Sequence, residues 1–269
     1  MSTTYRTFFG LRKEPFPMDL AIKDIFHTPQ VDGVMERLDY TIELGAIALV
    51  TGDIGPGKST ALRYAASSLH PSEYNVLYLT ASSGSILEFY RLLLNELGID
   101  ISSNSKALMV RTIKREILDL TLARKIKPVL IVDEASLIRL EVFAELHSLT
   151  QFEQDSKPYL PVILAGQSSL VDRLMYRTSS PLASRIVARS HLEGVNRQEM
   201  EDYLTHQLNI AGLKHSCFDD TAITAIHQGS GGLFRKANHL ARGAMLAAAK
   251  QKLAIVKADH VRMAASEIF

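Results

Sequence analysis

The chain has 269 residues, of which 46% are hydrophobic and 22% charged, so it has ample material for a buried core and is neither disordered nor fibrous. Its 30 Lys and Arg residues balance 29 Asp and Glu residues, so any nucleic-acid site must be a local patch. One cysteine, Cys217, excludes an internal disulfide and a Cys-based zinc site, and suits a reducing compartment. No apolar run has the ~20 residues of a membrane-spanning helix, and the N-terminus does not resemble a signal peptide, so a cytoplasmic protein is expected.

The N-terminal segment, residues 1–29, combines aromatic side chains with glycine and several prolines. Phe16 and Phe26 need burial, so the segment is expected to be an ordered, irregular arm that lies on the main domain. Residues 31–44 then place apolar side chains at helical spacing and predict a first helix.

Short runs that are apolar throughout then alternate with stretches of helical periodicity. Strands buried on both faces have this composition, which is typical of a parallel sheet covered by helices. The runs predict strands at 46–50, 75–80, 128–134, 159–166 and 186–192, and helices are expected at 58–70, 85–98, 106–124, 136–155 and 168–178. The alternation indicates an α/β domain over residues 30–194, with a parallel sheet and helices on both faces.

The pattern changes after about residue 195, where strand candidates cease. Asn196 is a candidate N-cap, because a glutamate follows at the third helical position. The sequence therefore predicts a small all-helical domain over residues 195–269, with helices at 197–212, 219–228, 232–251 and 257–268.

A phosphate-binding loop is predicted where residues 52–59 fit the pattern G-x-x-x-x-G-K-[ST] between a predicted strand and a predicted helix. Glycines allow the backbone to approach phosphate oxygens, and the N–H groups of the helix N-terminus face the anion. Lys58 is expected to reach the β/γ-phosphates of ATP, and the Ser59 hydroxyl to bind Mg²⁺. The predicted nucleotide-binding residues are Gly52, Asp53, Ile54, Gly55, Pro56, Gly57, Lys58, Ser59 and Thr60.

A carboxylate pair, Asp133 and Glu134, ends the buried strand candidate at 128–134. Ligands of open α/β sheets bind at the carboxyl ends of the strands. Asp133 is therefore expected to join the nucleotide-binding residues and to hold Mg²⁺, whereas Glu134 is positioned to orient or deprotonate the attacking water.

The phosphate loop and the carboxylate pair resemble those of P-loop ATPases with a catalytic glutamate, and the trailing helical domain resembles the lid of AAA+ ATPases. Several segments are similar to bacterial ExeA/GspA-type ATPases: FGLRKEPFPMD (9–19), LAGQSSL (164–170), LASRIVARSHLEGV (182–195) and GLFRKANHLARGAM (232–245). This resemblance implies a P-loop sheet followed by a helical lid, hydrolysis of ATP with Mg²⁺, and a homo-oligomer in the form of a ring or a filament.

The resemblance also implies roles for three polar residues. Gln167 matches the "sensor 1" position near the γ-phosphate, although it is alternatively an ordinary loop amide. Arg185 matches the arginine finger that reaches the ATP of a neighbouring subunit, with Arg189 as a rival. Arg235 resembles "sensor 2" at the start of a lid helix, where Phe234 replaces the usual proline.

Basic residues gather between residues 106 and 127, and two interpretations of them remain open. One is a solvated helix whose charges are balanced by Glu116 and Asp119. The other is a surface for the phosphate backbone of double-stranded DNA, formed by Lys106, Arg111, Lys114 and Arg115.

The process that the ATPase drives is predicted from a difference between this sequence and the secretion ATPases. Secretion ATPases of the ExeA/GspA type continue beyond this core into a transmembrane helix, whereas this sequence stops at Phe269. That difference favours a DNA-binding regulator of a transposase, related in function to TnsC, TniB and IstB, over a secretion-channel ATPase. A scaffold that binds ATP and barely hydrolyses it is a third possibility, against which Glu134 argues.

Overall fold

The computed structural model describes residues 2–267 and divides into two compact units. Pro29–Asp53 and Lys58–Leu192 form an α/β unit, and the remaining described residues form a helical unit that includes Ile54–Gly57. None of the helices in this described part of the chain is both long and apolar enough to cross a membrane.

A five-stranded parallel sheet forms the centre of the α/β unit, with the strand order β2-β3-β4-β1-β5. The strands are β1 (Ile47–Gly52), β2 (Tyr74–Thr80), β3 (Lys127–Asp133), β4 (Val162–Gly166) and β5 (Ile186–Leu192). This architecture confirms the predicted fold class. Because β4 lies between β1 and β3, the carboxyl ends of these three strands meet at one edge of the sheet, which is the usual ligand-binding edge.

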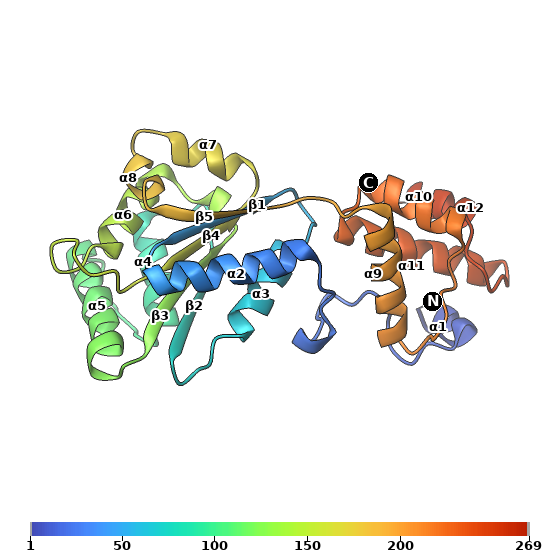
Figure 1. Cartoon of the computed structure of the whole chain (residues 1–269), viewed down its shortest axis with the longest axis horizontal. Coiled ribbons are helices and arrows are strands. Elements are labelled where there is room, and N and C mark those ends of the chain that lie inside the picture. Colours follow the sequence, from blue (N-terminus) through green and yellow to red (C-terminus); the bar gives the residue numbers. More distant parts are fainter. Residues whose placement is uncertain (1, 268–269) are drawn as a thin grey trace. The chain divides into compact units, whose positions relative to one another are not determined.

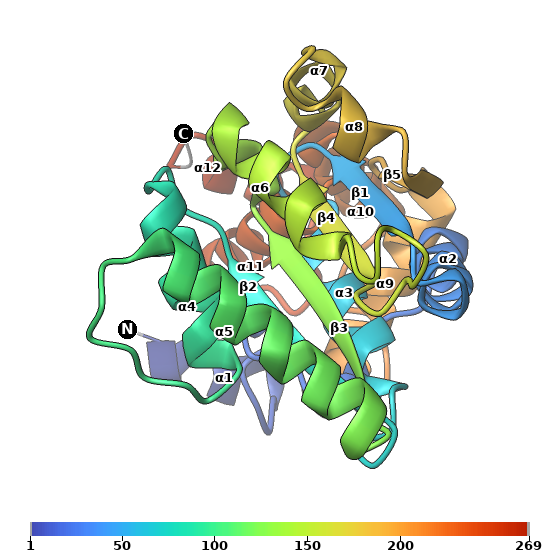
Figure 2. The ribbon, with the colours of Figure 1, turned by 90° about the vertical axis from the view of Figure 1, so that its left-hand side faces the viewer.

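Helices cover both faces of the sheet (Figures 1 and 2). Alternating side chains of the strands pack against the helices of the two faces. In β1, Ala48 and Val50 face α2 (Pro29–Leu44) and α3 (Lys58–Ser67). Ile47 and Leu49 belong to the core on the other face. The helices of that face are α4 (Ile86–Glu96), α5 (Lys106–Leu118), α6 (Leu140–Thr150), α7 (Ser169–Met175) and α8 (Ser180–Ala183). Burial on both faces explains why the inner strands β1, β3 and β4 are apolar along most of their length, whereas the edge strand β5 contains polar residues.

The segment between α6 and β4 differs from the predicted one, in which a helix continued to residue 155 and a strand began at residue 159. Helix α6 ends at Thr150, and β4 begins only at Val162. Pro161 has no N–H group for a strand ladder, which explains the late start of β4. A 3₁₀ turn, Ala135–Leu137, also separates β3 from α6.

The helical unit is built from α9 (Arg197–Ile210), α10 (Asp220–Ser230), α11 (Phe234–Lys250) and α12 (Ala258–Ala265). The predicted N-cap of α9 is confirmed. The Glu199 N–H donates to Asn196 Oδ1 at 2.9 Å, and the Asn196 N–H donates to Glu199 Oε2 at 2.9 Å. This reciprocal pair satisfies two N–H groups that a helix start otherwise leaves unbonded.

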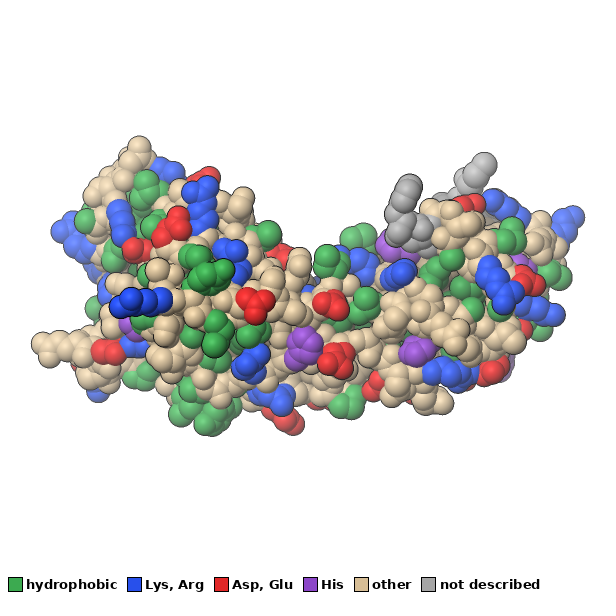
Figure 3. All heavy atoms as spheres, turned by 90° about the horizontal axis from the view of Figure 1, so that it is seen from above, with side chains coloured by type: hydrophobic (Ala, Val, Ile, Leu, Met, Phe, Trp, Pro, Cys, Tyr) green, Lys and Arg blue, Asp and Glu red, His purple; other side chains and the backbone are tan. Residues whose placement is uncertain are grey.

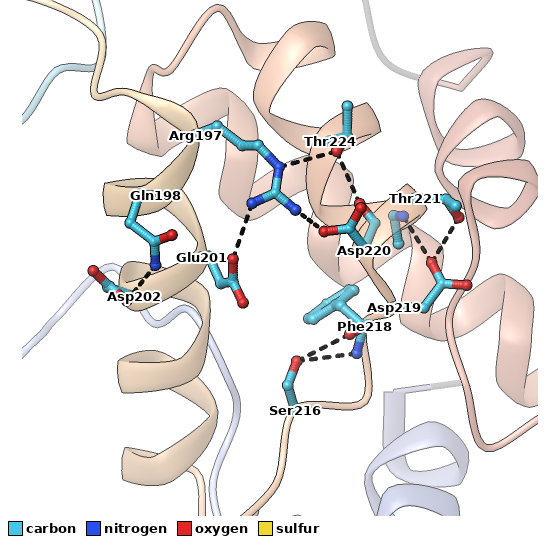
Figure 4. Close-up of polar contacts among 11 residues, drawn as sticks. Arg197, Gln198, Glu201, Asp202, Ser216, Phe218, Asp219, Asp220, Thr221 and Thr224 are labelled. Carbon is cyan, nitrogen blue, oxygen red and sulfur yellow. Dashed lines mark hydrogen bonds and ion pairs between the residues drawn. The ribbon is translucent and has the colours of Figure 1, made fainter.

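Arg197 joins the starts of α9 and α10 (Figure 4). Its guanidinium donates to Glu201 Oε2 at 3.0 Å, to Thr224 Oγ1 at 3.1 Å, and to Asp220. The planar guanidinium of an arginine can donate to three acceptors at once, and here it joins α9 to α10.

The N-terminal arm packs within the helical unit, which corrects the expectation that it lies on the main domain. It is also partly regular, with α1 at Ser2–Phe9 and a 3₁₀ turn at Ile22–Asp24. Tyr5 and Phe9 lie one turn apart and are buried in the core of that unit. The Arg242 guanidinium of α11 holds the arm further by donating to Phe16 O at 2.7 Å. Such tertiary contacts stabilise a helix that is too short to form alone.

Candidate active site

The predicted phosphate loop connects β1 to α3 in a conformation that requires glycine. Gly55 and Gly57 have φ angles of +102° and +104°, in a region that L side chains rarely adopt. Lys58 begins α3, and its side chain is only 8% exposed. Its ammonium donates to Gly52 O at 2.9 Å and to Asp53 O at 2.5 Å. The cation is therefore already held at the loop, where the phosphate of a nucleotide would meet it.

The start of α3 adds a second feature that favours an anion. Its first turn contains no acidic residue, so the positive end of the helix dipole is not neutralised there. Ser59 is exposed and Thr60 half-buried, so both are accessible to a ligand in this first turn. Loop and helix start together have the chemistry of a phosphate site.

Asp133 ends β3 and is almost fully buried, with 5% of its surface exposed. Its carboxylate accepts two hydrogen bonds. The Tyr78 hydroxyl of β2 donates to Oδ2 at 2.9 Å, and the Glu134 N–H donates to Oδ1 at 2.9 Å. Tyr78 is not recognisable from the sequence as a partner of Asp133, because only the pairing of β2 with β3 brings the two together.

Glu134 has a left-handed backbone conformation, with φ +54° and ψ +31°. For a residue other than glycine this conformation costs roughly 1–2 kcal/mol, and such strain is common at functional sites. The bend directs the chain from β3 into the following 3₁₀ turn, where the Leu137 N–H donates to Glu134 O at 2.9 Å. Glu134 is half-buried at the same sheet edge as Asp133.

Gln167 directly follows β4, whose neighbours in the sheet are β3 and β1. Its N–H donates to Ser136 Oγ at 3.4 Å, which links the end of β4 to the turn after Glu134. A Cβ atom at Gly166 would lie 2.8 Å from Ser136 N, so only glycine permits this close approach. The predicted sensor 1 residue is thus next to the carboxylate pair in the fold.

Arg185 precedes β5 and is engaged within its own chain. Its guanidinium pairs with the Asp155 carboxylate and donates to Thr150 Oγ1 at 3.3 Å. This arginine lowers the pKa of Asp155 through its hydrogen bonds and charge. Asp155 lies in a loop where Glu153, Gln154 and Asp155 all have positive φ angles.

Arg189, the rival finger, lies within β5 and is exposed. Among the described residues its side chain has no hydrogen-bond or ion-pair partner, although its backbone lies in the ladder with β1. The two candidates therefore differ. The ion pair between Arg185 and Asp155 must break before Arg185 can reach another subunit, whereas the side chain of Arg189 has no such ion pair.

Arg235 is exposed near the start of α11 in the helical unit. The same unit contains Gly55, whose carbonyl oxygen accepts a hydrogen bond from the Arg235 N–H at 3.2 Å. Helix α11 begins at Phe234, so the helix start predicted for sensor 2 forms although the usual proline is missing.

The residues present fit a magnesium ion bound together with a nucleotide. Mg²⁺ prefers oxygen ligands and is usually held by one or two carboxylates, waters and substrate phosphates. The Asp133 carboxylate and the Ser59 hydroxyl are donors of this kind. Among residues 2–267 no group of three or more His, Cys, Asp and Glu side chains could hold a metal without such help.

The basic residues between 106 and 127 differ in what they contact. Lys106 forms an ion pair with Glu145, and the Lys114 ammonium donates to Gln151 O at 2.9 Å. Arg111 and Arg115 are exposed, and no partner is found for either side chain in the described structure. On the face drawn in Figure 3, basic and acidic side chains are interspersed.

Known proteins that resemble this chain include a domain family and a longer bacterial relative. Residues 42–174 match the family model of an AAA domain. The General secretion pathway protein A of Aeromonas hydrophila is 30% identical over 266 residues, which cover 98% of this chain but 48% of that protein. The chain thus spans about half the length of this relative.

Solved structures confirm the fold. Cdc6p from Pyrobaculum aerophilum has a TM-score of 0.75 at 14% identity, over 94% of this chain and 70% of that one. The ORC1 protein of Aeropyrum pernix, solved in complex with DNA, has a TM-score of 0.68 at 16% identity, over 93% and 68%. The RuvB Holliday junction branch migration motor of Thermotoga maritima has a TM-score of 0.55 at 19% identity, over 88% and 69%. The chain therefore contains an AAA domain at residues 42–174 and is similar over nearly its whole length to General secretion pathway protein A.

Proposed function

We propose that this chain is an ATPase that hydrolyses ATP with Mg²⁺ and works as a nucleotide-switched oligomer. The observation that carries the proposal is the convergence of the phosphate loop, Asp133 and Glu134 at one edge of the sheet, where β4 alone separates β1 from β3. Glu134 favours hydrolysis over binding alone, because a carboxylate beside Asp133 at this edge can accept a proton from the attacking water.

Each residue has a role that its position supports. Lys58 binds the β/γ-phosphates, and Ser59 and Asp133 hold the metal, which neutralises charge on the phosphate oxygens. Glu134 accepts a proton from the attacking water, and Gln167 orients that water or touches the γ-phosphate. Arg185 of one subunit is proposed to act on the nucleotide of its neighbour, which would place the active site at a subunit interface.

The direct test is phosphate release by the purified protein with ATP, with and without Mg²⁺. We expect turnover that requires Mg²⁺. The rate per protein molecule should rise with protein concentration as oligomers form. The same preparation of a Lys58→Ala variant gives the background from contaminating ATPases. A wild-type rate no higher than that of the Lys58→Ala variant at every protein concentration would contradict the proposal.

For the client of this switch, we infer a role related to that of General secretion pathway protein A. The observation that favours it is the 30% identity over nearly the whole chain. A DNA-binding regulator of transposition is the second candidate, supported by the exposed Arg111 and Arg115 on α5. Binding to duplex DNA distinguishes the two.

If the second candidate is right, the protein should bind duplex DNA in the presence of ATP, with an affinity that falls steeply with salt. Replacing Arg111 and Arg115 together by Ala should reduce the log–log salt slope by about 1.8, because two phosphate contacts are lost. Lys106 and Lys114 are expected to contribute less, because Glu145 and Gln151 already engage them.

The matched control replaces two exposed lysines of the helical unit, Lys214 and Lys250, by Ala, which removes the same charge elsewhere. Fluorescence anisotropy with a labelled duplex at several salt concentrations gives the slopes. No binding at low salt in any nucleotide state would reject the DNA-binding candidate. Equal slopes for both double variants would place the DNA surface elsewhere.

A further inference from the structure

The hydroxyl of Tyr78 is joined to the carboxylate at the heart of the site. Tyr78 lies on β2, an edge strand, and Asp133 ends the neighbouring strand β3. In the parallel register Tyr78 pairs with Ile131, and Thr80 pairs with Asp133. Asp133 is therefore offset by two positions along β3 from the residue opposite Tyr78, and both side chains lie on the same face of the sheet. The tyrosine ring spans this diagonal, and its hydroxyl donates to Asp133 Oδ2 at 2.9 Å.

The carboxylate of Asp133 is thereby held at both oxygens. Oδ1 accepts the Glu134 N–H, and Oδ2 accepts the Tyr78 hydroxyl. An ionised carboxylate has about two lone pairs on each oxygen, so each oxygen keeps one for a further ligand. The backbone N–H is a fixed donor, but it holds only Oδ1. The tyrosine is the side chain that fixes the rotation of the carboxylate about its own axis.

We propose that Tyr78 is a positioning residue that fixes the Asp133 carboxylate for Mg²⁺. The inference rests on the proposed function, because it takes Asp133 as the metal ligand. Groups that hydrogen-bond to metal ligands commonly contribute 10–100-fold to metal affinity. Tyr78 acts through Asp133 and needs no contact with the nucleotide.

The test is a Mg²⁺ titration of ATP turnover by the full chain and its Tyr78→Phe variant, at saturating ATP. The half-saturating Mg²⁺ concentration should rise about tenfold in the variant. At saturating Mg²⁺ most of the turnover should return, because the metal itself then orders the carboxylate. The affinity for ATP in EDTA, measured with a fluorescent analogue, should be unchanged, because Tyr78 acts on the nucleotide only through the metal ligand.

Tyr74→Phe is the matched control. Tyr74 lies on the same strand and the same face as Tyr78, and its hydroxyl makes no hydrogen bond to any described residue. Its half-saturating Mg²⁺ concentration should equal that of the wild type. Thermal melting of both variants verifies the fold, which is expected to persist because each keeps its ring on a half-buried edge strand.

The possible outcomes distinguish the positioning role of Tyr78 from the proposed ATPase activity. Equal Mg²⁺ half-saturation in the wild type and Tyr78→Phe would overturn the positioning role and leave the ATPase intact. A loss of turnover that high Mg²⁺ does not restore would also overturn it, because it would indicate a structural or catalytic defect. A wild-type protein without Mg²⁺-dependent turnover would instead overturn the proposed function, and the role of Tyr78 with it.

Discussion

Glu134→Gln is expected to bind ATP as the wild type does and to hydrolyse it about two to four orders of magnitude more slowly, the usual contribution of a general base. The amide has nearly the shape of the carboxylate but cannot accept the proton of the attacking water. Phosphate release gives the rate, and binding of a fluorescent ATP analogue gives the affinity. Lys58→Ala should behave differently and lose binding itself, because the cation at the loop is removed.

Glu141→Gln is the matched control for this substitution. Glu141 is an exposed carboxylate in the first turn of α6, so the change of charge is the same but lies away from the sheet edge. Its turnover should match the wild type. A Glu134→Gln variant that hydrolyses ATP at the wild-type rate would show that another group activates the water.

Arg185→Ala is expected to leave ATP binding nearly unchanged and to reduce turnover by about 10³-fold or more, if this arginine acts as a finger. The structure adds a condition, because Arg185 is paired with Asp155 of its own chain. That pair must open before the guanidinium can reach a neighbouring subunit. Asp155→Asn weakens the pair, and it should therefore maintain or raise turnover rather than reduce it.

A finger that acts in trans gives a second signature. Mixing Arg185→Ala with Lys58→Ala protein should restore part of the activity, because some interfaces then combine an intact finger with an intact phosphate loop. Arg189→Ala is the comparison variant, since Arg189 is exposed and lies in the next strand. If Arg189→Ala loses turnover and Arg185→Ala does not, the role belongs to Arg189.

Local patterns in the sequence determined the secondary structure of this protein and the place of its phosphate loop. The continuous apolar runs predicted a parallel sheet, because a strand between two layers of helices must be apolar on both sides. The glycines and Lys58 predicted a strand-to-helix loop with φ angles that glycine allows, and the loop has them. Asn196 predicted the start of α9, because capping depends on residues only three positions apart.

Only the tertiary structure decided which distant side chains meet. Tyr78 reaches Asp133 across 55 positions because β2 pairs with β3 in one particular register. Arg185 reaches Asp155, and Lys106 reaches Glu145, through the packing of separate elements. The N-terminal arm likewise joined the helical unit, because the matching apolar surface lies there. Spacing along the chain encodes helices, strands and caps, whereas contacts between elements depend on strand order and packing, which local spacing leaves open.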